Sequence, residues 1–366
     1  MKIIDGDGHV FEDSDGLRKY LPSPFKDGRS LERWFPPLDH FHAFIGETPP
    51  GSFRRETGPK EWIEFMEDVG IDTAVLYTTS GLAVGKVFHL DWAIALCRAY
   101  NDWLHEEYLQ RSPRFRGMAL IPMQDPDAAA EELRRAVTQL GFCGAMLPST
   151  GLASHLGAKQ YWPVYQEADR LGCALGVHGG AHSGLGFDQM NVYTPVGGMG
   201  HPLALLINFS GILFNGLLDR YPNVKWGFLE GGVAWLEVAI ERFDRAHETH
   251  IQWNPRGELA PAPDEVVSEY IRKHVQAGRL FIGCEGDEPT LAHASAQVGS
   301  EAFVYSSDFP HEVNNAICKE EIQEMLECEE LTAQDKENIL HANAERFYGL
   351  GAGSAKAAAA AAAAGG

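Results

Sequence analysis

Short apolar runs recur along the chain, and longer amphipathic segments separate most of them. The runs show little alternation of polar and apolar residues, which is typical of parallel strands that are covered on both faces. Several amphipathic segments end in a glycine directly before the next run, at Gly70, Gly141 and Gly172, where glycine can cap a helix in the left-handed conformation. The alternation predicts repeated strand–helix units, with strands in residues 3–4, 71–77, 116–122, 143–149, 173–179, 224–232, 279–284 and 303–308.

The number of strand–helix pairs is about eight, which predicts a (β/α)8 TIM barrel of the α/β class. An open doubly wound sheet is the structural alternative, because hydrophobic periodicity alone does not separate the two. The chain has 366 residues, 45% of them hydrophobic, and barrels of this size often form one domain. We predict a single domain over residues 1–349, followed by a low-complexity tail, residues 350–366, that resembles a linker or tag.

Three segments interrupt the alternation of strands and helices. In a barrel, residues 11–60 and 179–200 follow the first and fifth strands, so we expect long loop insertions at the C-terminal face. Such loops can act as lids or substrate walls, and the alternative is a plain insertion or an oligomer contact. Residues 250–264 are expected to form a surface connection.

The composition excludes several classes of partner. The formal net charge is −21 with no basic run, so we expect no binding to nucleic acid. The six cysteines include no C-x-x-C pair and are predicted to be reduced core residues. The N-terminus has no apolar signal-peptide region, and no apolar stretch of membrane-spanning length is evident. We therefore predict a cytoplasmic protein without a membrane partner.

Charged and imidazole side chains stand where the predicted strands end. The carboxyl ends of parallel barrel strands converge on one mouth, so these side chains should meet there. Two imidazoles and several carboxylates in one pocket are best reconciled by a divalent cation; Zn²⁺ is our first expectation, and Mn²⁺ or Fe²⁺ the alternatives. Singly, each residue could instead be a helix cap, a turn residue or a buried core histidine. The residues are Asp7, His9, His178, Glu230, Glu285 and Asp308, with His182, His201 and His311 as weaker candidates.

Four motifs resemble the amidohydrolase superfamily. They are DGDGHV, LGVHGG, NVKWGFLEGGVAWL and VYSSDFPHE, and their order matches over about residues 1–349. The branch is amidohydrolase-related family 2, typified by aminocarboxymuconate semialdehyde decarboxylase and resorcylate decarboxylase. The resemblance implies a (β/α)8 barrel with a divalent metal at its mouth. It maps metal ligands onto Asp7 and His9, onto the fifth-strand His178 and onto the eighth-strand Asp308.

One position departs from this branch. The decarboxylases carry a sixth-strand histidine that handles the proton, and the matching residue here is Glu230. A carboxylate is a poorer acid near neutral pH unless its pKa is raised. Glu230 could instead be a ligand and, with His201 or His311, hold a second metal.

The resulting functional prediction is an enzyme. We expect a metal-dependent hydrolase or non-oxidative decarboxylase that acts on a small carboxylate-bearing molecule, with Asp308 or Glu230 moving the proton. Loop arginines could hold the substrate carboxylate through a bidentate contact. The substrate-binding candidates are Arg54, Arg55, His182 and, more weakly, Arg29.

Two other functions stay open. One is an oxygen-dependent oxygenase or hydroxylase with two manganese or iron ions on the same scaffold, and the other is a structural subunit that supports an active relative. We expect a homodimer or a hetero-oligomer with a related subunit, and the apolar segment 208–218 could form the interface or be an ordinary buried helix.

Overall fold

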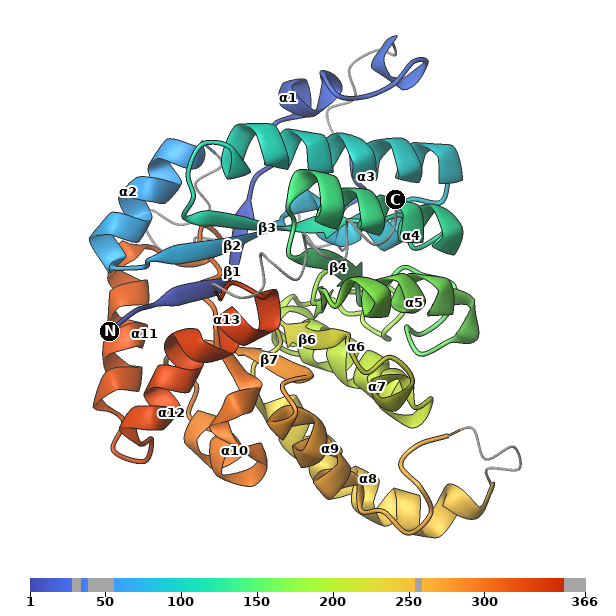
Figure 1. The fold of residues 1–366 in the computed structure, drawn as a ribbon, viewed down its shortest axis with the longest axis vertical. Coiled ribbons are helices and arrows are strands. Elements are labelled where there is room, and N and C mark those ends of the chain that lie inside the picture. Colours follow the sequence, from blue (N-terminus) through green and yellow to red (C-terminus); the bar gives the residue numbers. More distant parts are fainter. Residues whose placement is uncertain (28–33, 39–55, 254–258, 352–366) are drawn as a thin grey trace.

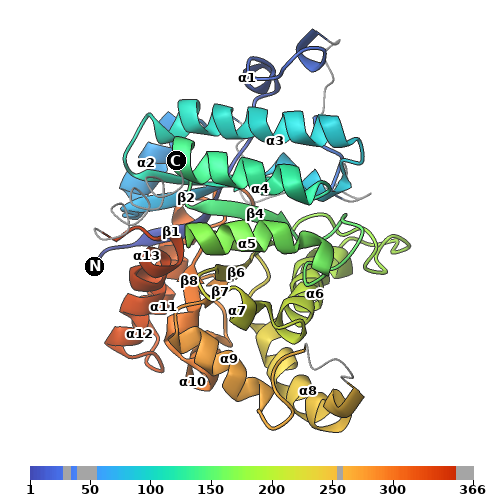
Figure 2. The same cartoon turned by 45° about the vertical axis from the view of Figure 1, so that its right-hand side comes forward.

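The computed structural model describes residues 1–27, 34–38, 56–253 and 259–351. Eight parallel strands form one sheet in the order β1 to β8 (Figures 1 and 2). Two backbone hydrogen bonds join its edges, from His9 N to Phe309 O (2.7 Å) and from Asp308 N to Asp7 O (3.1 Å). The sheet therefore closes into the predicted barrel rather than staying open. The strands are β1 (Ile4–Val10), β2 (Thr73–Thr78), β3 (Phe115–Leu120), β4 (Gly144–Pro148), β5 (Ala174–His178), β6 (Lys225–Leu229), β7 (Leu280–Cys284) and β8 (Phe303–Tyr305).

Helices surround the sheet, and α1 stands apart from them at the top of Figure 1. The amphipathic segments between the predicted strands contain helix, whereas α1, α9, α10, α12 and α13 were not anticipated. The helices are α1 (Ser14–Arg18), α2 (Pro59–Val69), α3 (Leu90–Leu104), α4 (Pro126–Arg135), α5 (Trp162–Leu171), α6 (Thr194–Phe214), α7 (Leu217–Arg220), α8 (Ala234–His250), α9 (Val267–Gln276), α10 (Leu291–Val298), α11 (Asn315–Glu327), α12 (Ala333–Glu337) and α13 (Asn343–Tyr348).

Helix α6 corrects two expectations. The predicted loop 179–200 ends early, because α6 begins at Thr194 with a proline in its first turn and with Val196 buried. By length and composition α6 could also cross a membrane, contrary to the expectation that no apolar stretch is long enough. Its Phe209 packs edge-on against Phe228 of β6 and Trp235 of α8, as the helix of a barrel does. Membrane-like composition in α6 is thus weak evidence for a membrane span.

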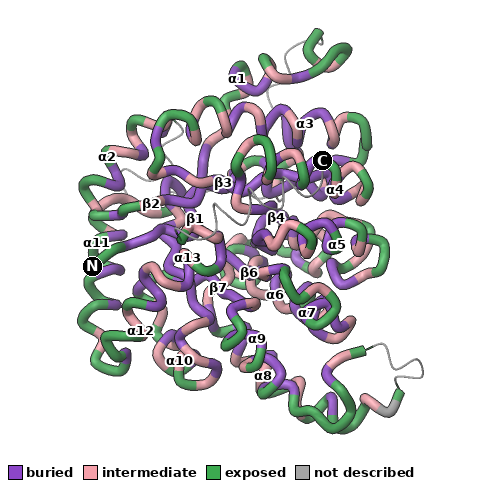
Figure 3. Tube along the Cα trace, viewed as in Figure 1, coloured by how far each residue is buried: buried purple, intermediate pink, exposed green. Residues whose placement is uncertain are grey.

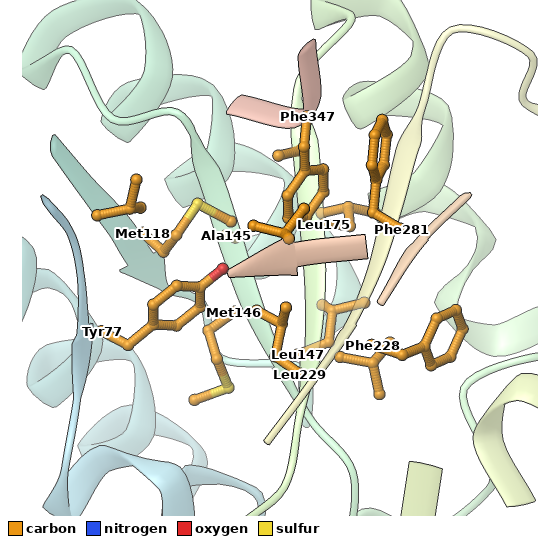
Figure 4. Packing of buried hydrophobic residues seen from close by; sticks show 14 of the residues in the cluster. Tyr77, Met118, Ala145, Met146, Leu147, Leu175, Phe228, Leu229, Phe281 and Phe347 are labelled. Carbon is orange, nitrogen blue, oxygen red and sulfur yellow. The ribbon is translucent and has the colours of Figure 1, made fainter. Parts of the chain in front are cut away.

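The core fills the barrel and the layer between the barrel and its helices (Figure 3). Phe347 of α13 reaches the barrel interior and stacks on Phe281 of β7 with ring centroids 5.0 Å apart. A Cβ at position 227 would lie 2.3 Å from the Phe347 ring, so glycine is required there for close approach. Figure 4 shows the surrounding side chains, Tyr77, Met118, Ala145, Met146, Leu147, Leu175, Phe228 and Leu229.

Candidate metal centre

Strand β1 carries the first two candidate ligands. Its pairing with β2 shifts by one residue between Asp5 and Gly8, which is a β-bulge. Beyond the bulge, Asp7 and His9 both turn into the barrel, where Asp7 Oδ1 lies 3.6 Å from His9 Nε2. Gly8 faces outward, and a Cβ there would lie 2.4 Å from the ring of Trp62. The glycine therefore lets α2 pack against the strand that presents the ligands.

The ring of His9 is oriented by a backbone group. Its Nδ1 lies 2.7 Å from the carbonyl oxygen of Thr78 and donates a proton to it, which leaves the Nε2 lone pair facing the pocket. Burial, followed by the charges of His311 and His178, lowers the pKa of His9 well below its usual value. His9 is therefore a neutral imidazole, the form that binds metals.

Asp7 and His178 complete a three-residue group. Donor atoms of Asp7, His9 and His178 lie within 4.8 Å of one another, and all three residues are buried. His178 Nε2 is 3.0 Å from Asp7 Oδ1, while its Nδ1 is 2.8 Å from the carbonyl oxygen of Gly179. If Nδ1 donates to that carbonyl, a proton or a metal cation on Nε2 is what makes the contact with Asp7 favourable.

The donor set fits a divalent cation. Within the described ranges, His9 Nε2 and Asp7 Oδ2 are buried atoms without a hydrogen-bond partner. A buried polar atom without a partner costs free energy, and a shared cation would satisfy both atoms. Imidazole nitrogens with carboxylate oxygens suit zinc, manganese or iron.

Asp308 lies beside this group on the closing edge of the barrel. Its Oδ1 is 3.5 Å from His9 Nε2 and 2.8 Å from His311 Nδ1. The ring of His311 stacks on that of His9 at 4.2 Å, and its Nε2 is 2.9 Å from Thr79 Oγ1. These residues form a second group of metal donors, His9, Asp308 and His311. Burial, with the nearby carboxylates and against the effect of His311, raises the pKa of Asp308 to about 6.

Glu230 contacts the centre through His178. Its Oε2 is 3.1 Å from His178 Nδ1, and its Oε1 is 3.6 Å from His201 Nδ1. Burial would raise the pKa of Glu230, but the neighbouring His201 and His178 outweigh burial and lower the pKa. Glu230 is therefore an ionised carboxylate and belongs to neither of the two donor groups.

The remaining candidates lie further out or cannot be placed. The ring of His182 is 4.8 Å from that of His201, on the far side of Glu230. Glu285 follows β7 but joins neither donor group, and burial raises its pKa to about 8. The substrate-binding candidates Arg29, Arg54 and Arg55 lie outside the described residues.

Asp5 is a buried carboxylate beside the candidate ligands, and no role was expected for it from the sequence. It is fully buried, and it accepts hydrogen bonds from Ser307 N (3.0 Å), Ser307 Oγ (2.7 Å) and Asp7 N (3.2 Å). Asp5 thus ties β1 to the residue before Asp308. The signal available was a charged residue inside an apolar strand, which is rare unless the charge is paired.

Glu12 was missed as well. It accepts hydrogen bonds from the backbone of Thr79 (3.1 Å) and Ser80 (2.9 Å), so it holds the loop after β2. In that loop, Thr79 contacts His311 and Lys86 lines a cavity of about 290 Å³ together with His182.

Known proteins resemble the chain over most of its length. The amidohydrolase family model matches residues 4–350. Gamma-resorcylate decarboxylase of Rhodococcus jostii is 27% identical, over 79% of this chain and 86% of its own. The 2-amino-3-carboxymuconate-6-semialdehyde decarboxylase of Dictyostelium discoideum is 26% identical, over 82% of this chain and 80% of its own.

Solved structures share the fold. 5-carboxyvanillate decarboxylase of Novosphingobium aromaticivorans, complexed with manganese and 4-hydroxy-3-methoxy-5-nitrobenzoic acid, superposes with a TM-score of 0.70 at 21% identity, covering 95% of this chain and 96% of that one. The same enzyme of Sphingomonas paucimobilis gives a TM-score of 0.73 at 21% identity, with 95% and 98% covered. The family match, at residues that carry the motifs, decides the classification: the chain belongs to the amidohydrolase family and is a metal-dependent enzyme of it.

Proposed function

We propose that the protein is a metal-dependent, non-oxidative decarboxylase of a small aromatic carboxylate. The curated relatives that support this proposal are decarboxylases of resorcylate and of aminocarboxymuconate semialdehyde. We further propose that Asp7, His9, His178 and Asp308 hold the metal and that Asp308 moves the proton.

The position of Asp308 carries the proposal. A decarboxylase must deliver a proton to the carbon that loses its carboxylate, and a general acid works best when its pKa lies near the working pH. Asp308 Oδ1 stands 3.5 Å from His9 Nε2 and 2.8 Å from His311 Nδ1, and burial raises the pKa of this carboxyl, whereas a bound cation would lower it. Glu230, whose pKa is lowered, is a poor proton donor, which assigns it the role of orienting His178 and His201.

The reaction breaks one carbon–carbon bond and forms one carbon–hydrogen bond. A bound divalent cation would polarise the oxygen atoms of the substrate and stabilise the bound substrate as an ionised carboxylate. Asp308 donates its proton to the ring carbon, the carbon–carbon bond breaks, and its electron pair returns to the ring as CO₂ leaves. Solvent then returns a proton to Asp308, and the hydrogen bond from His311 holds that carboxyl in place.

The cavity of about 290 Å³ is a candidate substrate pocket. The polar and aromatic residues that line it are Lys86, His182, Ser183, Phe187 and Asp188, so it offers one cation, one carboxylate, polar groups and an aromatic face. This size is at the lower end of ligand pockets and suits a single substituted ring. We propose that the substrate lies between this cavity and the metal centre.

The test is turnover by the metal-loaded protein. We would incubate it with 2,6-dihydroxybenzoate and with 5-carboxyvanillate and measure released CO₂. Asp308→Asn should lose at least about a hundredfold in kcat, as removal of a general acid does, while exposed Asp68→Asn should match the wild type. Hydrolysis of an ester or lactone without CO₂ release would contradict the proposal and support the hydrolase reading.

The identity of the metal is part of the proposal. The donor set suits zinc and manganese alike, and solved structures of this fold contain manganese, so both metals should be loaded and compared. Elemental mass spectrometry of protein purified without added metal gives the native ion. About one zinc per chain, lost in Asp308→Ala, is the expected result.

The two-metal oxygenase remains the alternative to be tested. The donor groups Asp7–His9–His178 and His9–Asp308–His311 share the one nitrogen of His9 that faces the pocket, so together they fit a single cation, and a second ion would need Glu230 beside the first group as a further ligand. About two manganese or iron ions per chain, with oxygen consumption during turnover, would favour this reading. The cytoplasmic location and the dimeric state remain predictions, which fractionation and light scattering would test.

A further inference from the structure

A cationic cavity lies on the face of the barrel opposite the metal centre. Its volume is about 440 Å³, and it is lined where β6 and β7 begin and where α5 ends. Lys225 is the first residue of β6, Arg279 immediately precedes β7, and Arg170 is in the last turn of α5. The cavity therefore collects cations in a protein that has 51 acidic residues and only 30 basic ones.

The counter-charges at this cavity are few. Asp169 is the acidic residue that lines it, and Asn223 N donates a 2.7 Å hydrogen bond to that carboxylate. Arg170 pairs with Glu167 at 2.6 Å. Across the described ranges, by contrast, neither Lys225 nor Arg279 forms an ion pair with a carboxylate. Arg279 Nη1 donates a 3.2 Å hydrogen bond to the carbonyl oxygen of Leu218, whereas its Nε is a buried atom without a hydrogen-bond partner. The charges of these two cations are thus not neutralised by a carboxylate.

The turn that carries Gly278 into Arg279 is packed from outside by Arg346 of α13. The aliphatic part of Arg346 packs over Gly278, where an added Cβ would lie 2.7 Å from Arg346 Cδ. Gly278 has a φ of 65°, so glycine supplies both the left-handed turn and the room for this approach. The turn between α9 and β7 therefore places Arg279 in the cavity, while the stem of Arg346 packs against the turn.

Without a bound anion, the mutual repulsion and the burial of these cations cost free energy. Burial lowers the pKa of Lys225. Burial, followed by the charge of Arg279, lowers the pKa of the adjacent His274 to about 4. An ammonium or guanidinium partly removed from water costs free energy unless an anion compensates it.

We propose that this cavity binds a small oxyanion with at least two negative charges, either a phosphate ester or a polycarboxylate. Lys225 supplies a point charge, and Arg279 supplies a planar fork that matches phosphate or carboxylate oxygens. The volume suits a metabolite rather than a macromolecule. This site is independent of the proposed decarboxylation. It is joined to the metal centre by β6, which begins at Lys225 and leads directly into Glu230.

Isothermal titration calorimetry of the metal-loaded protein would test the site. The probes are sulfate, inorganic phosphate and succinate, each at millimolar concentration. We expect one site per chain for at least one probe, with Lys225→Gln and Arg279→Gln each weakening the binding about tenfold or more. Binding of phosphate but not of succinate would identify the ligand as a phosphate ester. Binding of succinate but not of phosphate would identify it as a polycarboxylate.

The control is Arg242→Gln, the same charge change at an exposed position of α8. It should bind like the wild type, and an equal loss in this variant would mean unspecific attraction and overturn the proposal. Absence of binding for all three probes, or binding that survives both Lys225→Gln and Arg279→Gln, would overturn it too. Arg170→Gln, at a residue that lines the cavity, gives a second measure of the site if Arg279→Gln does not fold.

Discussion

Asp5→Ala is the substitution that best separates a positioning role from an ordinary buried carboxylate. The change removes the acceptor of two buried backbone N–H groups, on Asp7 and Ser307, and of the Ser307 hydroxyl. The hydroxyl also accepts from Phe309 N at 3.1 Å and can reorient, whereas the two N–H groups cannot. The loss of folding stability is therefore estimated from the two backbone N–H groups alone.

The magnitude follows from those two donors. Each orphaned buried donor costs roughly 1–3 kcal/mol, so the upper limit of the loss is about 6 kcal/mol. Burial raises the pKa of Asp5 to about 7, which shows that the carboxylate itself is expensive to bury, and the substitution recovers part of that cost. We expect the free energy of unfolding to fall by about 2–4 kcal/mol.

Urea unfolding followed by circular dichroism measures this loss. Asp125→Ala is the matched control, because it removes a single N-cap hydrogen bond from Ala128 N (3.1 Å) and should cost about 1 kcal/mol. Because Ser307 adjoins Asp308, we also expect the metal affinity of Asp5→Ala to fall about 10- to 100-fold. A loss no larger than that of Asp125→Ala, or an unchanged metal affinity, would refute the reasoning.

Three further changes test other parts of the structure. Gly227→Ala should cost about 1–3 kcal/mol in urea unfolding, because its Cβ would overlap the Phe347 ring, whereas Gly198→Ala has open space and should not destabilise. Burial raises the pKa of Glu321 from 4.5 to about 8, so the folded protein keeps a proton that the unfolded chain has released, and stability falls as the pH rises between these values. In Glu321→Gln, the contribution of this residue to the decrease of the melting temperature between these pH values should disappear. A variant with the same pH profile as the wild type would contradict this assignment. A chelator should lower the melting temperature of the wild type but not that of His9→Ala, and an equal decrease would place the metal elsewhere.

The barrel was predictable because each level of the sequence points to it. Apolar runs such as residues 71–77 and 173–179 lie on β2 and β5, and glycines at 70, 141 and 172 end the preceding helices in the left-handed conformation. Of the helices that were missed, α9 has a clear amphipathic pattern, with Val267, Ile271 and Val275 buried on one face, whereas the others have weaker local signals. Helix α13 has six residues, and its role comes from Phe347, which reaches across the barrel to Phe281. A contact between residues so far apart in sequence leaves no local pattern.

The site was predictable in membership but not in geometry. Asp7, His9, His178 and Asp308 were expected to meet, since strand ends converge, and they do. The bulge in β1 had no sequence signal apart from its glycines. It reverses the side of the strand on which Asp5 lies, so the simple count of alternate residues would have placed Asp5 in the pocket with Asp7.

Backbone strain gives an independent reason to treat Glu230 and Asp308 as functional. In the part of the chain that the structure describes, they are the two non-glycine residues with positive φ, at 58° and 52°. Such conformations cost of order 1–3 kcal/mol each and persist only where the surroundings impose them. Glycine would remove the strain at both positions, and the chain uses glycine for many other positive-φ turns, including Gly232 two residues after Glu230. Carboxylates in place of glycine at these strand ends therefore reduce stability, and what they provide in return is charge beside His178 and His9.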